Sequence, residues 1–469
     1  MRGPFVVVLL LTSFLSAEWK PRHSPGDLVI TNVNVIDTLE GNIFRGRTVV
    51  IRHGRIKAIA KVGLIDTRGI QVVNAGGKYL IPGLWDMHVH TGDLGKTWDD
   101  KALFPLFIAN GVTGVRDMSL DQDSLKERQA RIERGDILGP HLVVGPALAK
   151  KANATHFLNI SDAGEPLALA AFENDDHTAI AGRRPSDGLR LSFATTVGGA
   201  NTGFRQTIGS GYFVPPHARL EFSMEHLNAE LVACSSQEEE LKEERSQASA
   251  NRDLDGYWAV GMKAYETYDP AKAWDRFVQI SNNATWQVPA LVWTQAAADI
   301  DRPTLTRDPR LLYVSPAVRQ QWRPEGLLAQ VSPQRLLELK AQATRSLELV
   351  RSMHRAGVQF LAGTNAPAPY VFPGFSLHDE MELLVRGGLT NLQALQAATF
   401  NAALFLVNLD QYGIVQENHV ADLVLLNENP LEDIRNTRKI FAVVVGGNLY
   451  SRQDLDKMLG RVQELADQE

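Results

Sequence analysis

The stretch YLIPGLWDMHVHTG, residues 79–92, decides how the rest of this chain is interpreted. Side chains alternate between the two faces of a strand, so Asp86, His88 and His90 share one face and the residues between them share the other. Two imidazoles spaced roughly 7 Å along a strand can bind one divalent ion. His88 and His90 are therefore either candidate metal ligands or two half-buried histidines satisfied by hydrogen bonds.

Patterns typical of strands occur near both ends of the chain. Residues 26–83 alternate apolar and polar positions, with a turn at His53–Gly54. The same pattern returns after Leu409 in ADLVLLN and KIFAVVVGGNLYS. We expect the two ends to pair into one small β domain.

Between the two ends, strand-like and helix-like patterns alternate. Strands are expected at 84–90, 112–118, 141–146, 220–227, 286–293 and 358–363, and helices at 120–134, 228–247, 334–356, 376–386 and 391–407. Repeated βα units predict an α/β fold of the (β/α)8 TIM-type barrel class. The expected domains are a barrel over 84–408 and a small β-sandwich built from 26–83 and 409–455.

One stretch, residues 149–219, lacks a convincing period and is rich in Gly, Ser, Thr, Asn and Arg. A long structureless loop inside a compact domain counts against the assignment of the strands and helices around it. Either two strand–helix units lie there in irregular form, or this part of the sequence has degenerated.

Composition narrows the classes of function. The chain has 469 residues, with 48 Lys and Arg against 54 Asp and Glu, a formal net charge of −6. There is no basic block for a nucleic acid, and a single long apolar run excludes a polytopic membrane protein. A small-molecule partner is expected, and a homo-oligomer is compatible with the sequence. The single cysteine, Cys234, cannot form an internal disulfide, so any metal must be held by His and carboxylates.

The stretch MRGPFVVVLLLTSFLSAEWK, residues 1–20, has an early Arg, an apolar run and small residues at Ser16 and Ala17. This layout is typical of a secretory signal peptide, here residues 1–17. Export to a periplasmic or extracellular location is the expectation, and an uncleaved anchor is the alternative. No other membrane association is expected.

The chain resembles the metal-dependent amidohydrolase superfamily, in its imidazolonepropionase- and prolidase-like branch. The resemblance rests on LIPGLWDMHVHTG, ANGVTGVRDM, GPHLVVGPAL, SMEHL, TWQVPALV and the long stretches 361–406 and 413–450, in the order of the family. It implies a barrel flanked by a β-sandwich from both chain ends. It also implies hydrolysis of an amide, a cyclic amide, or an Xaa-Pro or N-acyl amino acid bond by a metal-activated water, with a dipeptide-like or other small substrate.

Carried over by position, the resemblance implies that His88, His90 and His226 in SMEHL bind the metal. Zn²⁺ is the expected ion, and Fe, Ni and Mn also suit imidazole ligands. Without the family context, His226 is interpreted as a core histidine.

The sequence departs from the family at three positions. The family's eighth-strand Asp, a metal ligand and proton acceptor, is replaced by Asn365 in AGTNAP, and an amide cannot act as a general base. No lysine lies between Lys151 and Lys242 to be carboxylated as a bridging ligand. The fifth-strand histidine is His177, His217 or absent. A centre with one ion is therefore expected.

Two hypotheses follow for the function. The first is an exported mononuclear hydrolase acting on a C–N bond, with His226 or a nearby imidazole assisting proton transfer in place of the missing Asp. The second is a catalytically impaired member that keeps the fold as a binding protein. A damaged coding sequence is a third alternative, because good family matches bound the poor segment on both sides.

Two further pairs of residues have competing interpretations. Arg116–Asp117 is either a structural ion pair under the metal site or a substrate clamp. His378 and Asp379 in FSLHDE either cap the start of a helix, together with Ser376, or contact substrate.

Overall fold

The structure is a computed structural model, and it describes residues 27–91, 100–119, 122–144, 177–183, 190–196, 222–251, 253–329 and 331–468. The expected signal peptide at 1–17 and His217 lie outside the described residues.

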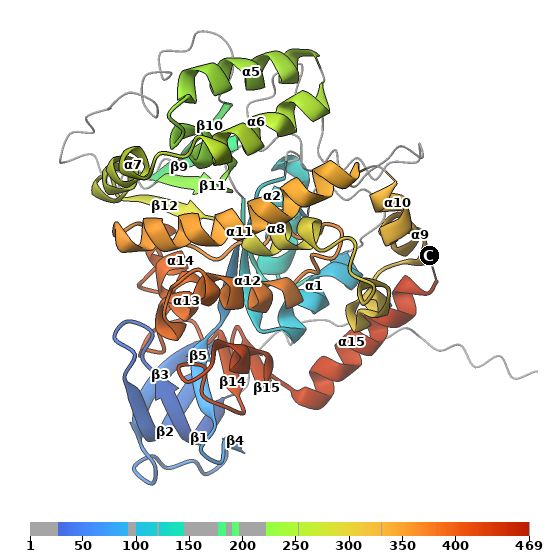
Figure 1. Cartoon of the computed structure of the whole chain (residues 1–469). Coiled ribbons are helices and arrows are strands. Elements are labelled where there is room, and N and C mark those ends of the chain that lie inside the picture. The colour runs from blue at the N-terminus through green and yellow to red at the C-terminus, as the bar shows by residue number, and fades with distance from the viewer. Residues whose placement is uncertain are drawn as a thin grey trace, which may run out of the picture.

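Strands from both ends of the chain form one eight-stranded sheet, at the bottom of Figure 1. Its path runs β16-β15-β14-β5-β1-β2-β3, with β4 paired to β1. The strands are β1 (Leu28–Ile36), β2 (Ile43–Arg52), β3 (Arg55–Lys61), β4 (Gln71–Asn74), β5 (Tyr79–Pro82), β14 (Leu423–Leu426), β15 (Ile440–Val445) and β16 (Asn448–Ser451). The two ends meet where β14 runs antiparallel to β5, with Leu425 opposite Leu80.

This sheet forms because its alternating apolar positions bury one shared core. Ile30, Val49, Ile56, Leu80 and Val444 belong to this cluster and are almost fully buried. The alternation predicted from the sequence therefore places these side chains on the inner face of the sheet.

The middle of the chain contributes two three-stranded parallel sheets, β6-β7-β8 and β11-β12-β13. The strands are β6 (Leu84–Val89), β7 (Val112–Asp117), β8 (His141–Val144), β11 (Phe222–Glu225), β12 (Thr285–Val288) and β13 (Gln359–Phe360). Every residue of β6 and β7 is buried, as expected for parallel strands covered on both faces.

Backbone hydrogen bonds join the two parallel sheets into one curled surface. The segment after β13 binds β6, with Met87 N donating to Ala362 O and His90 N donating to Ala366 O, both at 2.8 Å. Leu361 N donates to Gln287 O of β12 at 2.9 Å. The carboxyl ends of β6 and β11 are thereby brought to the same region.

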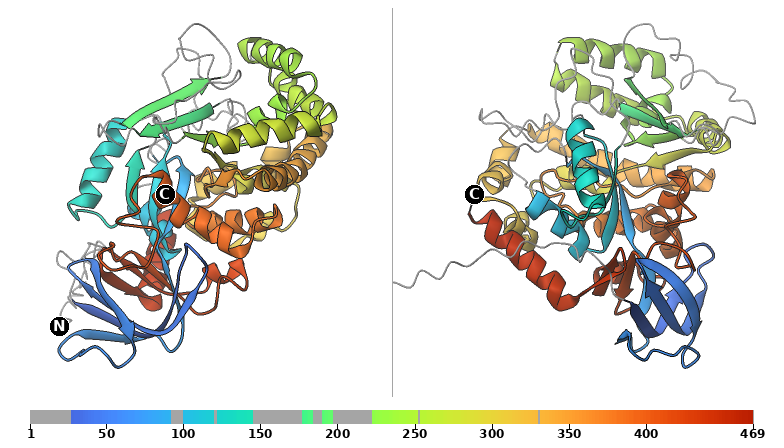
Figure 2. Two further views of the ribbon diagram at one scale, coloured as in Figure 1. Left: turned by 90° about the vertical axis from the view of Figure 1, so that its left-hand side faces the viewer. Right: turned by 180° about the vertical axis from the view of Figure 1, so that it is seen from behind.

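Helices surround the parallel strands (Figure 1). They are α1 (Asp100–Ala109), α2 (Gln122–Glu133), α4 (Asn228–Ala233), α5 (Glu238–Asn251), α6 (Leu254–Glu266), α7 (Pro270–Asn282), α8 (Leu291–Ala298), α9 (Pro316–Gln321), α10 (Pro324–Leu328), α11 (Pro333–Arg355), α12 (Phe375–Arg386), α13 (Asn391–Ala397), α14 (Phe400–Phe405) and α15 (Arg452–Ala466), with 3-10 turns η1 (Leu305–Arg307), η2 (Pro309–Tyr313) and η3 (Ile434–Arg438). Helix α8 packs against α11 and α12, and α15 packs against α1 (Figure 2).

Local capping explains where two of these helices begin. The Asp269 side chain accepts from Ala271 N and Lys272 N, and Pro270 occupies the first helical position of α7. Thr390 and Gln393 form a reciprocal capping box at the start of α13.

The strand expected over 286–293 is shorter than predicted. Strand β12 ends at Val288, and Ala290 has a φ of 48°, a left-handed conformation that turns the chain into α8. Leu291–Trp293 therefore begin a helix. In an apolar run of this length, periodicity alone cannot distinguish a buried strand from a buried helix.

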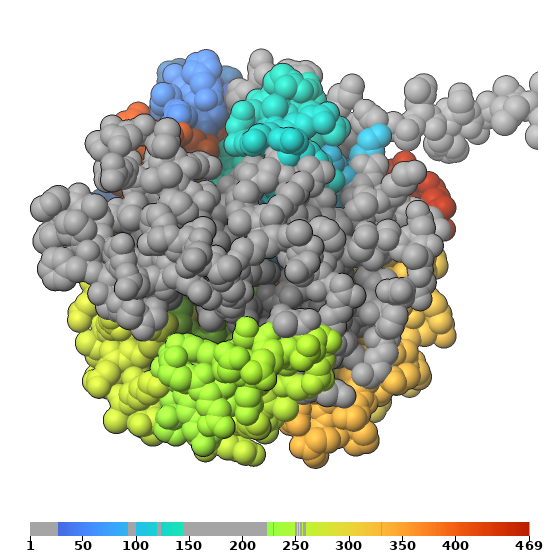
Figure 3. Space-filling model, turned by 90° about the horizontal axis from the view of Figure 1, so that it is seen from above, coloured from blue at the N-terminus to red at the C-terminus, as the bar shows by residue number. Residues whose placement is uncertain are grey.

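Two short strands lie within the irregular stretch 149–219. Strands β9 (His177–Arg183) and β10 (Arg190–Thr196) pair antiparallel, whereas barrel units are parallel. The rest of this stretch lies outside the described residues. Seen from above, α2 occupies one edge of the molecule and α5 with α6 the opposite edge (Figure 3). None of the described helices is both long enough and apolar enough to cross a membrane.

Candidate active site

Three imidazoles gather at the carboxyl ends of β6 and β11. The Nε2 atoms of His88 and His90 lie 3.1 Å apart. The rings of His88 and His226 approach edge to face, with centroids 4.9 Å apart. The ring of Trp293, on α8, also packs against His226, at the same centroid distance. The three predicted ligands are therefore neighbours, and Trp293 shields one of them from water.

A buried network of charged side chains contacts His88. Glu225 Oε2 is 2.7 Å from His88 Nδ1, and Glu225 Oε1 accepts from Arg116 Nη2 at 2.6 Å. Ser223 Oγ donates to the same Oε1 at 2.6 Å. The side chains of Arg116 and Glu225 are each only 1% exposed. This network joins three strands, since His88 is on β6, Arg116 on β7 and Glu225 on β11.

The surroundings of this network favour an ionised Glu225 and a neutral His88. Burial opposes ionisation of Glu225, but the Arg116 charge and the hydrogen bonds from His88 and Ser223 outweigh it and lower its pKa to about 2. Burial lowers the pKa of His88, reinforced by His90 and Arg116 and opposed by Glu225. The carboxylate thus faces an imidazole that has one N–H to donate.

Asp86 lies two residues before His88 on β6 and is held by Thr364. Thr364 Oγ1 donates to Asp86 Oδ2 at 2.7 Å, and Thr364 N donates to Oδ1 at 3.0 Å. Burial raises the pKa of Asp86 to about 7, despite these hydrogen bonds and the charge of Arg116. This contact ties β6 to the segment that carries Asn365.

His226, directly after β11, and Asn365, in the segment that follows β13, share an uncommon backbone conformation, with φ values of 60° and 64°. His226 N donates to Val288 O, and Asn365 N donates to His88 O, both at 2.8 Å. Left-handed non-glycine residues are rare and are enriched at functional sites. The predicted proton-acceptor position, Asn365, is thus directly bonded to the backbone of a predicted ligand.

The residues present partly fit a histidine-bound ion. Among the residues that the structure describes, no group of three or more His, Cys, Asp or Glu side chains is arranged as a metal cluster. However, the facing Nε2 atoms of His88 and His90 suit a borderline ion such as Zn²⁺, and the carboxylate on His88 Nδ1 is the outer contact that ligating histidines commonly have.

Arg116 does form a structural ion pair beneath the imidazoles, but its partner is Glu225 and not Asp117. Successive strand residues point to opposite faces, which separates the two side chains. Asp117 accepts instead from the backbone and hydroxyl groups of Thr91 and Ser119.

His378 and Asp379 do not cap helix α12. The N-cap is Gly374, which makes no side-chain cap, and Ser376 Oγ accepts from Phe372 N instead. Buried His378 contacts the Thr437 hydroxyl and the Asn110 carbonyl. Asp379 pairs with Arg310 and Arg438, so neither residue lies with the imidazoles.

A sequence comparison matches one part of the chain to a known family. The amidohydrolase family matches residues 335–450, the segment that contains Asn365. The fold agrees, because the structure of a putative prolidase from Bifidobacterium longum covers 94% of this chain and 100% of its own, with a TM-score of 0.55 and 18% identity. Residues 335–450 thus resemble the amidohydrolase family, and the fold of the chain resembles that of the putative prolidase.

Curated relatives match this chain over shorter stretches. A dihydroorotase from Trichlorobacter lovleyi is 37% identical over 91 residues, 19% of this chain and 21% of the relative. An ochratoxinase from Aspergillus niger is 35% identical over 118 residues, 24% of each chain. The chain thus spans less than a quarter of the length of the relatives it matches.

Sequence reasoning missed Glu225, although it lies next to His226 in the quoted SMEHL motif. A glutamate in an otherwise apolar strand is a signal of a buried ion pair, because carboxylates are almost never fully buried alone. The fifth-strand histidine stays undecided. The backbone of His177 is in β9, but its side chain is not described.

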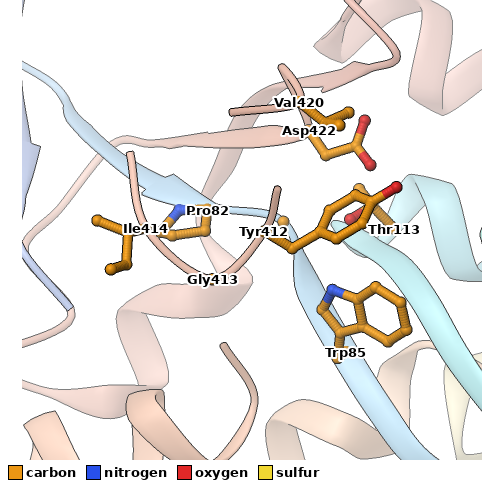
Figure 4. Close-up of a pocket in the computed structure, with 9 residues that line it drawn as sticks. Pro82, Trp85, Thr113, Tyr412, Gly413, Ile414, Val420 and Asp422 are labelled. Atoms are coloured by element: carbon orange, nitrogen blue, oxygen red, sulfur yellow. The ribbon is translucent and has the colours of Figure 1, made fainter. Parts of the chain in front are cut away.

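A narrow crevice lies at the start of β6, between the parallel strands and the eight-stranded sheet, and Figure 4 shows its lining. Trp85, Thr113 and Tyr412 line it together with Asp422. Asp422 already binds His141 Nε2 at 2.7 Å and Gly446 N at 2.6 Å. The Asp422 carboxylate is thus used internally, so we interpret the crevice as a packing seam.

Proposed function

We propose that the protein is a hydrolase of C–N bonds that binds one divalent ion through His88, His90 and His226. The observation that carries the proposal is the meeting of these three imidazoles at the strand ends of an amidohydrolase-superfamily fold. In parallel α/β barrels the active site is built at that end of the strands.

This proposal includes a (β/α)8 barrel and a β-sandwich from both chain ends. The hydrogen-bonded series β11-β12-β13-β6-β7-β8 supports the barrel, as does the parallel bridge between Val89 and Ala366. Pairing of β14 with β5 supports a domain built from both ends. We also propose export through residues 1–17, on the sequence pattern alone.

A bound divalent ion supplies two effects in such a site: it lowers the pKa of a water and polarises the scissile carbonyl. The protein's own residues orient the proposed ligands and shield them from water. Glu225 holds the His88 ring, and Trp293 packs against His226 and limits access of bulk water. The proton released by the attacking water needs an acceptor. The Asn365 amide cannot take it, and a His226 that binds the ion has its lone pair engaged there, so a nearby imidazole outside the ligand set would have to accept the proton.

The proposed substrate class rests on the chemistry of the candidate site and on the similarity of the fold to solved structures. A solved structure with this fold is that of a Xaa-Pro dipeptidase with bound methionine in the active site, and it covers 91% of this chain with a TM-score of 0.53. We propose a dipeptide-like or N-acyl amino acid substrate.

The test is hydrolysis of Xaa-Pro dipeptides and N-acyl amino acids by the purified protein loaded with Zn²⁺. We expect turnover that His226→Ala reduces by about 10²-fold or more. His354→Ala, in the last turn of α11, is the matched control and should retain full activity. Turnover unaffected by His226→Ala contradicts the assignment.

Asn365 supports a second candidate, a binding protein that has lost catalysis. Its amide occupies the position where the family resemblance implies a general base. Substrate binding by calorimetry without turnover, at full ion occupancy, would favour this candidate.

A further inference from the structure

We propose that Glu225 is a positioning residue for His88, fixing the ring so that its Nε2 lone pair faces His90. The inference deepens the proposed function and rests on it, because it names what orients one of the proposed ligands.

The Glu225 carboxylate is held on both sides. Oε2 lies 2.7 Å from His88 Nδ1, while Oε1 accepts from Arg116 Nη2 and Ser223 Oγ, each at 2.6 Å. The side chains of His88 and Glu225 are only 5% and 1% exposed. The carboxylate therefore cannot turn away from His88 without leaving a buried charge unpaired.

Arg116 is anchored to the strand that carries His88. Its Nε donates to Met87 O at 2.6 Å, and its Nη1 donates to Ser223 Oγ at 2.7 Å. The guanidinium thus fixes the carboxylate relative to the backbone one residue before His88. Planar, multidentate contacts of this kind give geometric precision that a single hydrogen bond does not.

The arrangement has a chemical consequence for the imidazole. An ionised carboxylate only accepts hydrogen bonds, so His88 Nδ1 must donate. A neutral imidazole has one N–H, which leaves Nε2 with a lone pair 3.1 Å from His90 Nε2. A metal-ligating nitrogen needs that lone pair.

A second buried pair shows that an Arg–Glu contact alone does not require a histidine. Glu230 of α4 accepts from Arg276 of α7 through both carboxylate oxygens, at 2.8 and 2.9 Å. The Glu230 side chain is 2% exposed, and the pair contains no imidazole. It supplies a matched control for the loss of a buried carboxylate.

The test is Glu225→Gln in the full-length, metal-free protein. Arg116 and Ser223 would keep the amide oxygen on their side, so the amide NH₂ would face His88 Nδ1. His88 must then accept at Nδ1 and carry its proton on Nε2. NMR of ¹⁵N-histidine-labelled protein reports this tautomer. We expect the Nδ1–H form in the wild type and the Nε2–H form in the variant.

The second readout is Zn²⁺ affinity, measured by competition with a chelator. We expect Glu225→Gln to weaken binding by about 10–100-fold, the typical cost of losing such an outer contact. Glu230→Gln should leave both the tautomer and the affinity unchanged. Equal losses of affinity in the two variants would overturn the positioning role.

If Glu225→Gln does not fold, the double variant Arg116→Met with Glu225→Leu removes both buried charges, a change that folds tolerate better than a single deletion. We expect a folded protein with weakened Zn²⁺ binding. A folded double variant with wild-type affinity would overturn the proposal.

The two readouts separate this inference from the proposed function. Wild-type protein that binds no Zn²⁺ contradicts the proposed function, but the tautomer is measured without the ion. A wild-type His88 protonated on Nε2 overturns the role of Glu225.

Discussion

The backbone amide of Asn365 donates a 2.8 Å hydrogen bond to the carbonyl oxygen of His88. This bond places Asn365, which the family resemblance puts at the position of the proton acceptor, beside a proposed ligand. Asn365 is 7% exposed, so its amide is largely withdrawn from solvent.

We predict that Asn365→Asp raises hydrolysis and tightens Zn²⁺ binding. A carboxylate adds both a negative ligand and a proton acceptor, and a positioned general base contributes about 10²- to 10⁴-fold. Steady-state kinetics and chelator competition measure the two effects. Rapid turnover by the wild type that slows in Asn365→Asp would show that Asn365 is not a degraded base.

The protein is predicted to bind at most one divalent ion per chain. His88→Ala combined with His90→Ala should abolish binding, because both facing Nε2 donors are lost. Elemental analysis after dialysis gives the stoichiometry. Two tightly bound equivalents in the wild type would mean that a bridging ligand had been missed.

Glu380 should make the protein less stable as the pH rises. Burial raises the pKa of Glu380 to about 8, although its carboxylate accepts from Val292 N at 2.7 Å. The group is protonated in the native state up to that pH but ionises above about 4.5 when unfolded. The native state therefore holds more protons between these values, and the free energy of unfolding falls there by up to about 1.4 kcal/mol per pH unit.

Glu380→Gln should flatten that decline, since the amide does not titrate and its oxygen can still accept from Val292. Urea unfolding across the pH range measures the slope. Glu382→Gln, on the same helix but 40% exposed, is the control and should retain the wild-type slope. Parallel curves for wild type and Glu380→Gln would contradict the prediction.

The contact between His141 and Asp422 predicts a second pH effect, at the junction of β8 with the eight-stranded sheet. Burial lowers the pKa of His141, but the charge and hydrogen bond of Asp422, with Glu133, outweigh it and raise the pKa. Tyr412 and Trp85 complete its surroundings. The added stability is full below about pH 6.5 and is lost as the pH rises through the folded pKa.

His141→Gln removes this titration. We expect wild type to be more stable than His141→Gln near about pH 6, and the difference to shrink near about pH 9. Thermal unfolding of both proteins at the two pH values is the measurement. A difference that grows with pH would show that His141 is not stabilised as a cation.

Local patterns in the sequence were sufficient to predict much of the fold. Period-two alternation predicted the strands of the eight-stranded sheet and placed Asp86, His88 and His90 on one face, because strand geometry is set by the backbone alone. Helix periodicity predicted α11 and α12 to within a residue. It failed where an apolar run was ambiguous, as at Leu291–Trp293, and it left α6, α7 and α15 unassigned.

The partners of the site residues were decided by the tertiary structure. His88 and Glu225 are 137 positions apart, and no local rule indicates that β11 delivers its carboxylate to β6. Arg116 selects Glu225 over its sequence neighbour Asp117, since adjacent strand residues face opposite ways and a buried guanidinium needs a carboxylate on its own side. Sequence alone determined which residue types stand on each strand face. The curling of the parallel strands decided which of those faces meet, because that depends on contacts between distant segments.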